Sequence, residues 1–470
     1  MSVSHSQEII ENKTFDEIHV GDSARLVRTL TRADVDGFAA VSGDTNPTHL
    51  DNAYAAGNTP VHEIVGHSMW TASLISSVLG NSLPGMGTIY LDQKLHFDLP
   101  VRVGDTVTVM VKAIGKHADN KSVTFECLVQ NQHQQTVASG EAIVLPPINK
   151  IRREKISAPQ IQLFDPDTRL KALLELGAHL EPISCGIVHP CEAGALQGAI
   201  EAAEQSLIRP VLIGPKSRIL AIAEQAQLDI RQFDIIDTPH SHASAEIAAQ
   251  MAAEGKLEAL MKGSLHTDEF MGAVVSNPKL RTKRRISHVW RFEVPLYSKP
   301  LLISDAAINI APHLMEKMDI VQNAITLAHV LGNPMPKVAI LSAVETITAS
   351  ISSTLDAAAL CKMADRQQIT GAILDGPLAF DNAISAKAAQ IKNISSPVAG
   401  QADILIAPDL ESANMIGKQL EYLAGATSSG IVLGARIPLA LTSRADGPIS
   451  RISSALLAKL VAHYYRSNKP

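Results

Sequence analysis

A carboxylate and an imidazole stand five residues apart in the segment VSGDTNPTHLDNAYA, residues 41–55. Asn46 and Pro47 lie between Asp44 and His49, and the proline disfavours a continuous helix, so we expect both side chains on an ordered turn. Such a pair can hold one water molecule. One group can take a proton from that water while the other donates a proton to a substrate. The two residues alone also fit a helix cap and a surface histidine.

Polar residues follow several apolar runs later in the chain: Asp305, the DGP at 375–377 and the TSRAD at 442–446. If the runs are strands of a parallel sheet, ligands bind beyond their carboxyl ends. An arginine there suits phosphate, because its planar guanidinium donates paired hydrogen bonds. Simpler interpretations stay open: Asp305 with Asn309 as a helix cap, DGP as a turn, and the serine–arginine pair as a cap and a surface charge.

Other reactive side chains give weaker signals. His240 and His242 resemble a metal-ligating pair, but no third ligand stands nearby in the sequence. We therefore interpret them as a helix start. The basic run RTKRR, residues 281–285, either contacts phosphate groups or lies in solvent. We expect no metal site, and we interpret the four cysteines as small buried hydrophobic residues: Cys127, Cys185, Cys191 and Cys361.

Composition excludes several classes of protein. The 470 residues include 41 Lys and Arg against 47 Asp and Glu, so the net charge is −6, which argues against a nucleic-acid partner. No apolar run approaches the roughly 20 residues of a membrane span, and the first residues do not resemble a secretory signal. Together with the few cysteines, this favours a cytoplasmic protein. The length predicts at least two domains.

Two regions with different hydrophobic patterns support that division. Over residues 1–146, alternating apolar and polar residues predict antiparallel strands, and residues 67–80 predict one helix packed closely on them. A proline-rich, charged segment, 147–160, is interpreted as a linker. Over residues 161–470, apolar runs alternate with Ala-rich helical stretches, which predicts an α/β domain with parallel sheets. The predicted strands are 107–113, 123–129, 136–145, 210–214, 300–305, 337–342, 371–376, 402–409 and 430–435.

The first region resembles a known enzyme family. SGDTNPTHLD, GHSMWTASLISSVLG and LPGMGTIYLDQKLHFDLPVRVGDTVTV occur in the order found in the MaoC-like (R)-specific enoyl-CoA hydratases. The resemblance implies an α+β hotdog fold, in which an antiparallel sheet surrounds a long helix. It also implies hydration of a trans-2-enoyl-CoA to a (3R)-3-hydroxyacyl-CoA. Asp44 and His49 would activate water, and Asn46 would hold their turn.

The same resemblance makes the start of the predicted helix a substrate site. Backbone N–H groups near His67 and Ser68 would stabilise the charge that develops on the thioester oxygen. The family's His-Gly-Met is His67-Ser68-Met69 here. Ser68 therefore either crowds the carbonyl, adds a donor, or is an ordinary first helical residue. The unusual segment 61–68 also fits a rival function, in which this domain only binds acyl-CoA or oligomerises.

The second region resembles the phosphate acetyl/butyryltransferases through four segments, 262–275, 301–320, 375–385 and 432–446. The resemblance implies two α/β lobes and reversible transfer of an acyl group between CoA and inorganic phosphate, without a covalent acyl-enzyme. It implies that Arg444 stabilises developing charge, that Ser443 hydrogen-bonds the phosphate or the carbonyl, and that Asp446 acts as base toward the CoA thiol, although its spacing from the arginine is short. The substrate-binding candidates are Thr267, Arg284 or Arg285, Asp305 and Asn309.

Acyl-CoA is the ligand common to both resemblances. We therefore expect a bifunctional enzyme that uses acyl-CoA and phosphate as substrates, needs no other cofactor, and binds neither nucleic acid nor membrane. The resemblance further implies a homo-oligomer. A second rival function remains, in which only the hydratase works and the α/β domain is a scaffold.

Overall fold

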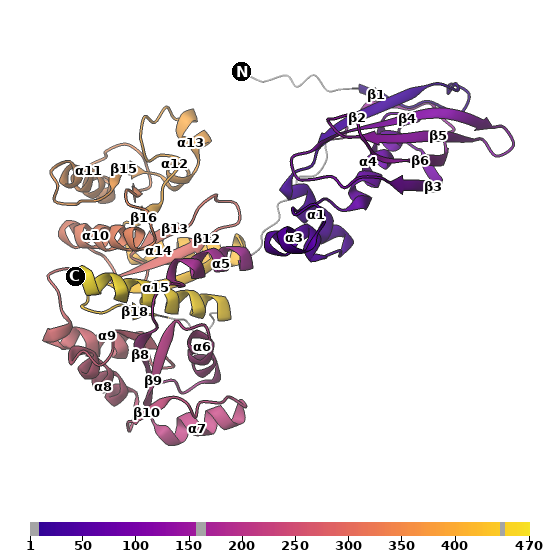
Figure 1. The fold of residues 1–470 in the computed structure, drawn as a ribbon. Helices are drawn as coiled ribbons and strands as arrows, with labels where there is room; N and C mark the ends of the chain where they lie inside the picture. Colours follow the sequence, from indigo (N-terminus) through magenta and orange to yellow (C-terminus); the bar gives the residue numbers. More distant parts are fainter. Residues whose placement is uncertain (1–8, 157–165, 442–446) are drawn as a thin grey trace. The chain divides into compact units, whose positions relative to one another are not determined.

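The computed structural model describes residues 9–156, 166–441 and 447–470. The chain divides into two compact units, Met1–Phe164 and Asp165–Pro470, and Figure 1 labels many of their elements. Within the described residues, no helix combines the length and the apolar character that crossing a membrane requires.

The first unit is built on a five-stranded antiparallel sheet with the strand order β2-β4-β5-β6-β3. Helix α4 (Ser68–Asn81) packs on this sheet through Ile75 and Leu79, while alternate residues of β4, such as Val109 and Val111, are fully buried. The structure confirms the predicted hotdog fold. The strands are β2 (Ser23–Thr29), β3 (Ile89–Phe97), β4 (Thr106–His117), β5 (Ser122–Gln130) and β6 (Thr136–Leu145).

Three short helices separate β2 from α4: α1 (Arg32–Ser42), α2 (Pro47–Leu50) and α3 (Asn52–Asn58). They carry the segment that contains the acidic and imidazole side chains. A further two-stranded sheet pairs β1 (Ile9–Glu11) with β7 (Arg152–Glu154). Part of the segment expected to be a linker is therefore a strand, and an ion pair of 3.3 Å between Arg152 and Glu11 joins it to β1.

The second unit contains one eleven-stranded sheet with the order β10-β9-β8-β11-β18-β17-β12-β13-β16-β14-β15. The strands β10, β9, β8, β11 and β18 are parallel, and so are β13, β16, β14 and β15. These strands are β8 (Ile183–Val188), β9 (Ile208–Gly214), β10 (Asp234–Asp237), β11 (Ala259–Lys262), β13 (Leu301–Ser304), β14 (Lys337–Leu341), β15 (Ile373–Leu378), β16 (Ile404–Ile406) and β18 (Leu439–Ala440).

The two central strands, β12 (Ser287–Glu293) and β17 (Thr427–Leu433), break the parallel pattern. β12 is antiparallel to both β13 and β17, and β17 is antiparallel to β18. The two parallel groups consequently run in opposite directions. The prediction of parallel strands is confirmed, but the antiparallel centre was not foreseen, because fully buried strands have the same apolar pattern in either direction.

Helices cover the two parallel groups separately, which produces two lobes (Figure 1). α6 (Ala193–Glu204), α7 (Lys216–Gln225), α8 (Ser241–Ala253) and α9 (Thr267–Ser276) accompany β8–β11. The other lobe has α10 (Leu314–Val330), α11 (Ser352–Asp365), α12 (Phe380–Ile384), α13 (Ala386–Ile391) and α14 (Leu410–Leu423). The remaining helices are α5 (Pro166–Gly177) and α15 (Pro448–Ser467).

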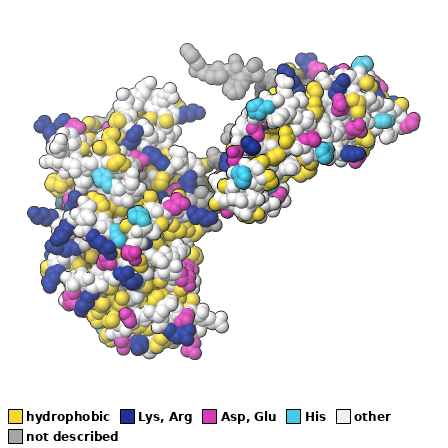
Figure 2. Space-filling model, in the orientation of Figure 1, with side chains coloured by type: hydrophobic (Ala, Val, Ile, Leu, Met, Phe, Trp, Pro, Cys, Tyr) yellow, Lys and Arg dark blue, Asp and Glu magenta, His cyan; other side chains and the backbone are white. Residues whose placement is uncertain are grey.

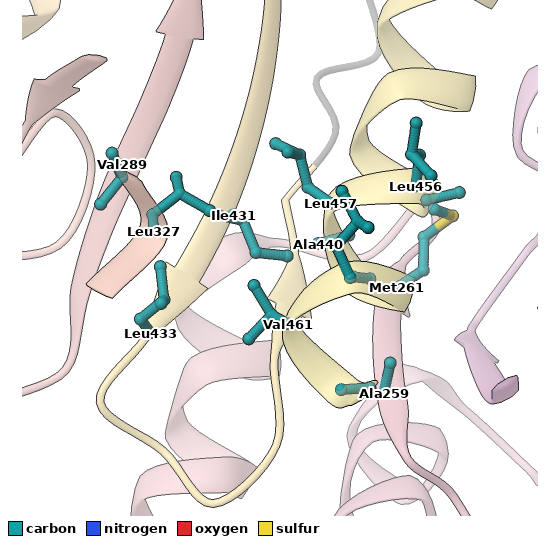
Figure 3. Packing of buried hydrophobic residues seen from close by; sticks show 14 of the residues in the cluster. Ala259, Met261, Val289, Leu327, Ile431, Leu433, Ala440, Leu456, Leu457 and Val461 are labelled. Carbon is teal, nitrogen blue, oxygen red and sulfur yellow. The ribbon is translucent and has the colours of Figure 1, made fainter. Parts of the chain in front are cut away.

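The last helix, α15, packs on the centre of the sheet. Figure 3 shows Leu457 and Val461 among side chains from both lobes, including Met261 of β11, Ile431 of β17 and Leu327 of α10. All five side chains are at most 4% exposed. Burial of this much apolar surface, at about 25 cal/mol per Å², joins the lobes into one unit.

His288 on β12 makes the stability of this unit sensitive to acid. Its side chain is 1% exposed, and burial lowers its pKa to about 4. The unfolded chain has an ordinary histidine pKa of about 6.5, so it binds more protons than the folded chain between these values. The free energy of unfolding therefore falls as the pH drops through this window.

We expect the His288→Leu variant to lose that part of the acid sensitivity. Between pH 7 and pH 5, wild type should lose about 2 kcal/mol through His288, and the variant should lose that much less. Urea unfolding at both pH values measures the difference. The exposed His179→Leu serves as control, and equal pH slopes for wild type and His288→Leu would contradict the assignment.

Candidate active sites

Asp44, His49 and His67 come together in the first unit. One carboxylate oxygen of Asp44 and one ring nitrogen of each histidine all lie within 4.8 Å of one another. Asp44 is exposed, His49 is half-buried and His67 is only 2% exposed. The structure thus brings together the predicted pair, and it adds His67, which stands 18 residues further along the chain.

Local sequence fixes the turn that carries Asp44 and His49. Gly43 ends α1 with a φ of 75°, a left-handed conformation that glycine adopts without strain. The Asn46 side chain then accepts a hydrogen bond of 3.1 Å from the Thr48 N–H, and Pro47 occupies the first position of α2. The proline begins a short helix rather than only interrupting one, since its missing N–H is not needed at that position.

Two backbone carbonyls orient the imidazoles. His49 Nδ1 lies 2.7 Å from the Val65 carbonyl oxygen, and His67 Nε2 lies 3.0 Å from that of Asp44. A carbonyl oxygen only accepts, so each of these nitrogens carries the proton. The other nitrogen of His49, Nε2, is then available to accept a proton from water. The ring centroids of His49 and His67 are 3.9 Å apart, so the buried ring supports the more accessible one.

Helix α4 begins directly after His67. The His67 side chain does not cap this helix, and Ser68, its first residue, is exposed. The first N–H groups of a helix have no intrahelical acceptor and carry a partial positive charge. The start of α4 therefore has donors suited to a developing oxyanion, and it directly follows the histidine that contacts the Asp44 turn.

Three predicted residues of the second unit, Ser443, Arg444 and Asp446, lie outside the described residues. The described chain before them includes β18, where Ala440 pairs with Met261 of the parallel strand β11. The loops at the carboxyl end of β11 are described, and they include the substrate candidate Thr267.

That end is tightly organised around Gly263. A Cβ atom at Gly263 would lie 2.6 Å from the carbonyl oxygens of Val188 and His189, so only glycine fits there. Ser264 donates a hydrogen bond of 2.9 Å to the His189 carbonyl and accepts one from the Cys191 N–H at 3.2 Å. These bonds join the loops after β8 and β11 into one rigid edge.

Two further side chains belong to this edge. The buried Lys262 ammonium donates to the carbonyl oxygens of Gly263 and Leu265 at 3.2 and 3.3 Å. Thr267, the substrate candidate, is half-buried at the first position of α9, where Glu269 accepts a hydrogen bond of 3.3 Å from the His266 N–H.

Asp305 and Asn309 form a buried loop after β13, each 3% exposed. The Asp305 carboxylate accepts hydrogen bonds from three backbone N–H groups, those of Ala307, Ile308 and Asn309. Burial raises the pKa of Asp305, although these hydrogen bonds oppose the shift. No described helix begins here, since α10 starts at Leu314, so the helix-cap interpretation was wrong.

Arg285, rather than Arg284, contacts that loop. Its Nε donates a hydrogen bond of 2.8 Å to the Asn309 side chain, and its Nη1 forms an ion pair of 3.0 Å with Glu316. Arg284 instead points to Thr326 on α10 at 3.3 Å. Much of the basic run 281–285 is exposed, and Figure 2 shows Lys and Arg side chains gathered on the side of the second unit near α9 and the C-terminus.

Sequence analysis missed a cavity of about 540 Å³ at the carboxyl ends of β14 and β16. Lys317 and Asp356 line it as an ion pair of 2.7 Å, and the hydroxyls of Ser342 and Ser353 lie 2.8 Å apart. Ser342 is the last residue of the predicted strand 337–342 and directly follows β14, so its place at a strand end was the available signal.

The remaining candidates have structural roles. DGP is not a turn, because it lies inside the edge strand β15, where the missing N–H of Pro377 is tolerated. His240 caps α8 by accepting from the Ala243 N–H, which confirms the helix-start interpretation. Three cysteines are buried and Cys361 is half-buried; burial raises the pKa of the Cys185 thiol to about 12, which disfavours the reactive thiolate.

Both units match models of known protein families. Residues 242–458 match the family model for phosphate acetyl/butaryl transferase, and residues 19–134 match that for the MaoC like domain. A phosphate acetyltransferase of Rhizobium meliloti is 56% identical over 277 residues, covering 59% of this chain and 88% of the relative. A phosphate butyryltransferase of Clostridium acetobutylicum is 39% identical over 268 residues, covering 57% and 89%.

A solved structure supports the fold of the second unit. The branched-chain phosphotransacylase from Enterococcus faecalis V583 is 29% identical, with a TM-score of 0.53, and the match covers 60% of this chain and 99% of that one. The chain therefore belongs to the phosphate acetyl/butyryltransferase family, and it carries a MaoC-like domain ahead of the transferase domain.

Proposed function

We propose that this protein is a bifunctional acyl-CoA enzyme. Its first unit hydrates trans-2-enoyl-CoA to (3R)-3-hydroxyacyl-CoA, and its second unit transfers an acyl group reversibly between CoA and inorganic phosphate. The family assignment supports the transferase. The observation that supports hydration is the meeting of Asp44 and His49 close to the start of α4 within a MaoC-like domain.

Hydration needs a base, an acid and a site for negative charge. Water held between Asp44 and His49 loses a proton as its oxygen bonds to C3 of the enoyl group. The electron pair of the double bond moves toward the thioester oxygen, where N–H groups at the start of α4 stabilise it. A proton then reaches C2, which completes the addition of water.

Acyl transfer needs stabilisation of three charged groups. A phosphate oxygen attacks the thioester carbonyl, the carbon–sulfur bond breaks, and the CoA sulfur takes a proton. Arg444 would neutralise charge on the phosphate and on the carbonyl oxygen, Ser443 would hydrogen-bond the reacting group, and Asp446 would exchange the proton with the thiol. The rigid edge around Gly263 and Thr267 is our candidate for the acyl-CoA contact.

Two assays on the full-length protein test the proposal. Both use a panel of CoA thioesters with acyl chains of two to eight carbons. One assay follows loss of the double bond in the members that are long enough to carry it. The other follows phosphate-dependent release of the CoA thiol. We expect both activities. Acyl-CoA binding without hydration would instead support a first unit that only binds acyl-CoA. Release of CoA that phosphate does not stimulate would refute the transferase.

A further inference from the structure

The three side chains that meet in the first unit are all electron-pair donors. With its Nδ1 proton directed at the Val65 carbonyl, neutral His49 has a lone pair on Nε2, and neutral His67 correspondingly has one on Nδ1. That nitrogen of His67 is buried and has no hydrogen-bond partner among the described residues. The Asp44 carboxylate adds acceptor oxygens. One ligand atom from each of the three side chains lies within 4.8 Å of the other two, so the cluster offers a cation one carboxylate and two imidazoles.

We propose that this cluster is a binding site for a divalent transition-metal ion, with Zn²⁺ the best fit, and that the bound ion blocks hydration. Two imidazoles and one carboxylate form a common ligand set for such ions. Each imidazole here has its second nitrogen available for a backbone carbonyl, the arrangement that orients metal-binding histidines in many proteins. A water molecule would complete the coordination of the ion.

The geometry permits this with a small adjustment. Bonds of about 2.0–2.2 Å to zinc place tetrahedral ligand atoms about 3.3–3.5 Å apart. One carboxylate oxygen of Asp44 and one ring nitrogen of each histidine already lie within 4.8 Å of one another, and the two histidine rings are adjacent. The Asp44 side chain is exposed. Among the described residues, the hydrogen bond that it accepts is a long one, 3.3 Å from the Asn46 N–H. Its loop can therefore close on an ion that enters from solvent.

Metal binding does not depend on the proposed hydratase function, but the inhibition does. An ion at this point occupies the place of the water that Asp44 and His49 would activate, and it takes up the lone pair that His49 needs as a base. We therefore expect Zn²⁺ to stop hydration, and we expect removal of the ion with a chelator to restore it.

Binding is tested with Co²⁺, whose visible absorption reports its coordination. The full-length protein, first stripped with a chelator, is titrated with Co²⁺, and Zn²⁺ competition is followed on the same signal. We expect wild type to bind one more equivalent of Co²⁺ tightly than Asp44→Asn or His49→Ala does. In each variant the affinity of this site for Co²⁺ should be at least about 10-fold weaker. His62→Asn is the matched control, since exposed His62 also bonds a backbone carbonyl through Nδ1 but is not in the cluster.

The outcomes separate the two hypotheses. Identical titrations of wild type and both variants would overturn the metal site, whatever the activity. If Asp44→Asn loses the Co²⁺ site but metal-free wild type hydrates no enoyl-CoA, the metal site stands and the hydratase function is rejected. Hydration that Zn²⁺ leaves unchanged at concentrations saturating the cobalt signal would overturn the inhibition.

Discussion

Arg444→Ala is expected to lower kcat/KM for phosphate-dependent CoA release by about 10²–10³-fold, the usual loss when one group that stabilises developing charge is removed. Phosphate brings two negative charges to a thioester whose oxygen is itself becoming negative. Without the guanidinium, that repulsion is unopposed at the reacting centre. We expect enoyl-CoA hydration by the same variant to match wild type, because the cluster of Asp44 and His49 belongs to the other unit.

Two companion variants make this result specific. Arg444→Lys keeps the charge but loses the paired donors, so we expect it to recover only part of the activity. Arg436→Ala removes an exposed arginine between β17 and β18, and it should leave CoA release unchanged. The assay is thiol release at several phosphate concentrations. Full activity in Arg444→Ala would refute the role that the resemblance implies for this arginine.

The elements of both units were largely predictable, but the direction of two central strands was not. Alternation in β4, β5 and β6 is strong because each strand has one buried face, and the helix α4 stands out by its length. β12 and β17 are buried almost throughout, so their residues carry no mark of antiparallel pairing. That direction depends on long-range pairing with β13 and β18.

The candidate site was predictable where its residues are neighbours in sequence. Asp44 and His49 share one turn, and Gly43, Asn46 and Pro47 give that turn its shape locally. His67 contacts both only because the chain returns after α3, and no short-range pattern reports this.

Long-range contacts in the second unit could not be predicted from the sequence for the same reason. Arg285 meets Asn309 across 24 positions, so the sequence did not distinguish Arg285 from Arg284. Asp305 was open to a helix-cap interpretation because its hydrogen bonds to following N–H groups are the same in a buried loop as at a helix start.

His49→Ala is expected to lower kcat for enoyl-CoA hydration by about 10²–10⁴-fold, the range that a general acid–base group contributes. The variant loses the nitrogen that faces the water. It keeps the Asp44 carboxylate and the start of α4, so binding of the thioester should persist and KM should change much less than kcat. CoA release by the second unit should be unaffected.

The structure also supplies the control for this experiment. His67 packs against the His49 ring at 3.9 Å, so removing that ring leaves a gap above a buried side chain, and a loss of activity has to be distinguished from a loss of fold. His49→Gln fills more of the gap but lacks a basic nitrogen, and we expect it to be as inactive as His49→Ala. Thermal unfolding of both variants tests the fold. Hydration by His49→Gln at the wild-type rate would show that the imidazole takes no part in the chemistry, and the proton would then have to pass through Asp44 alone.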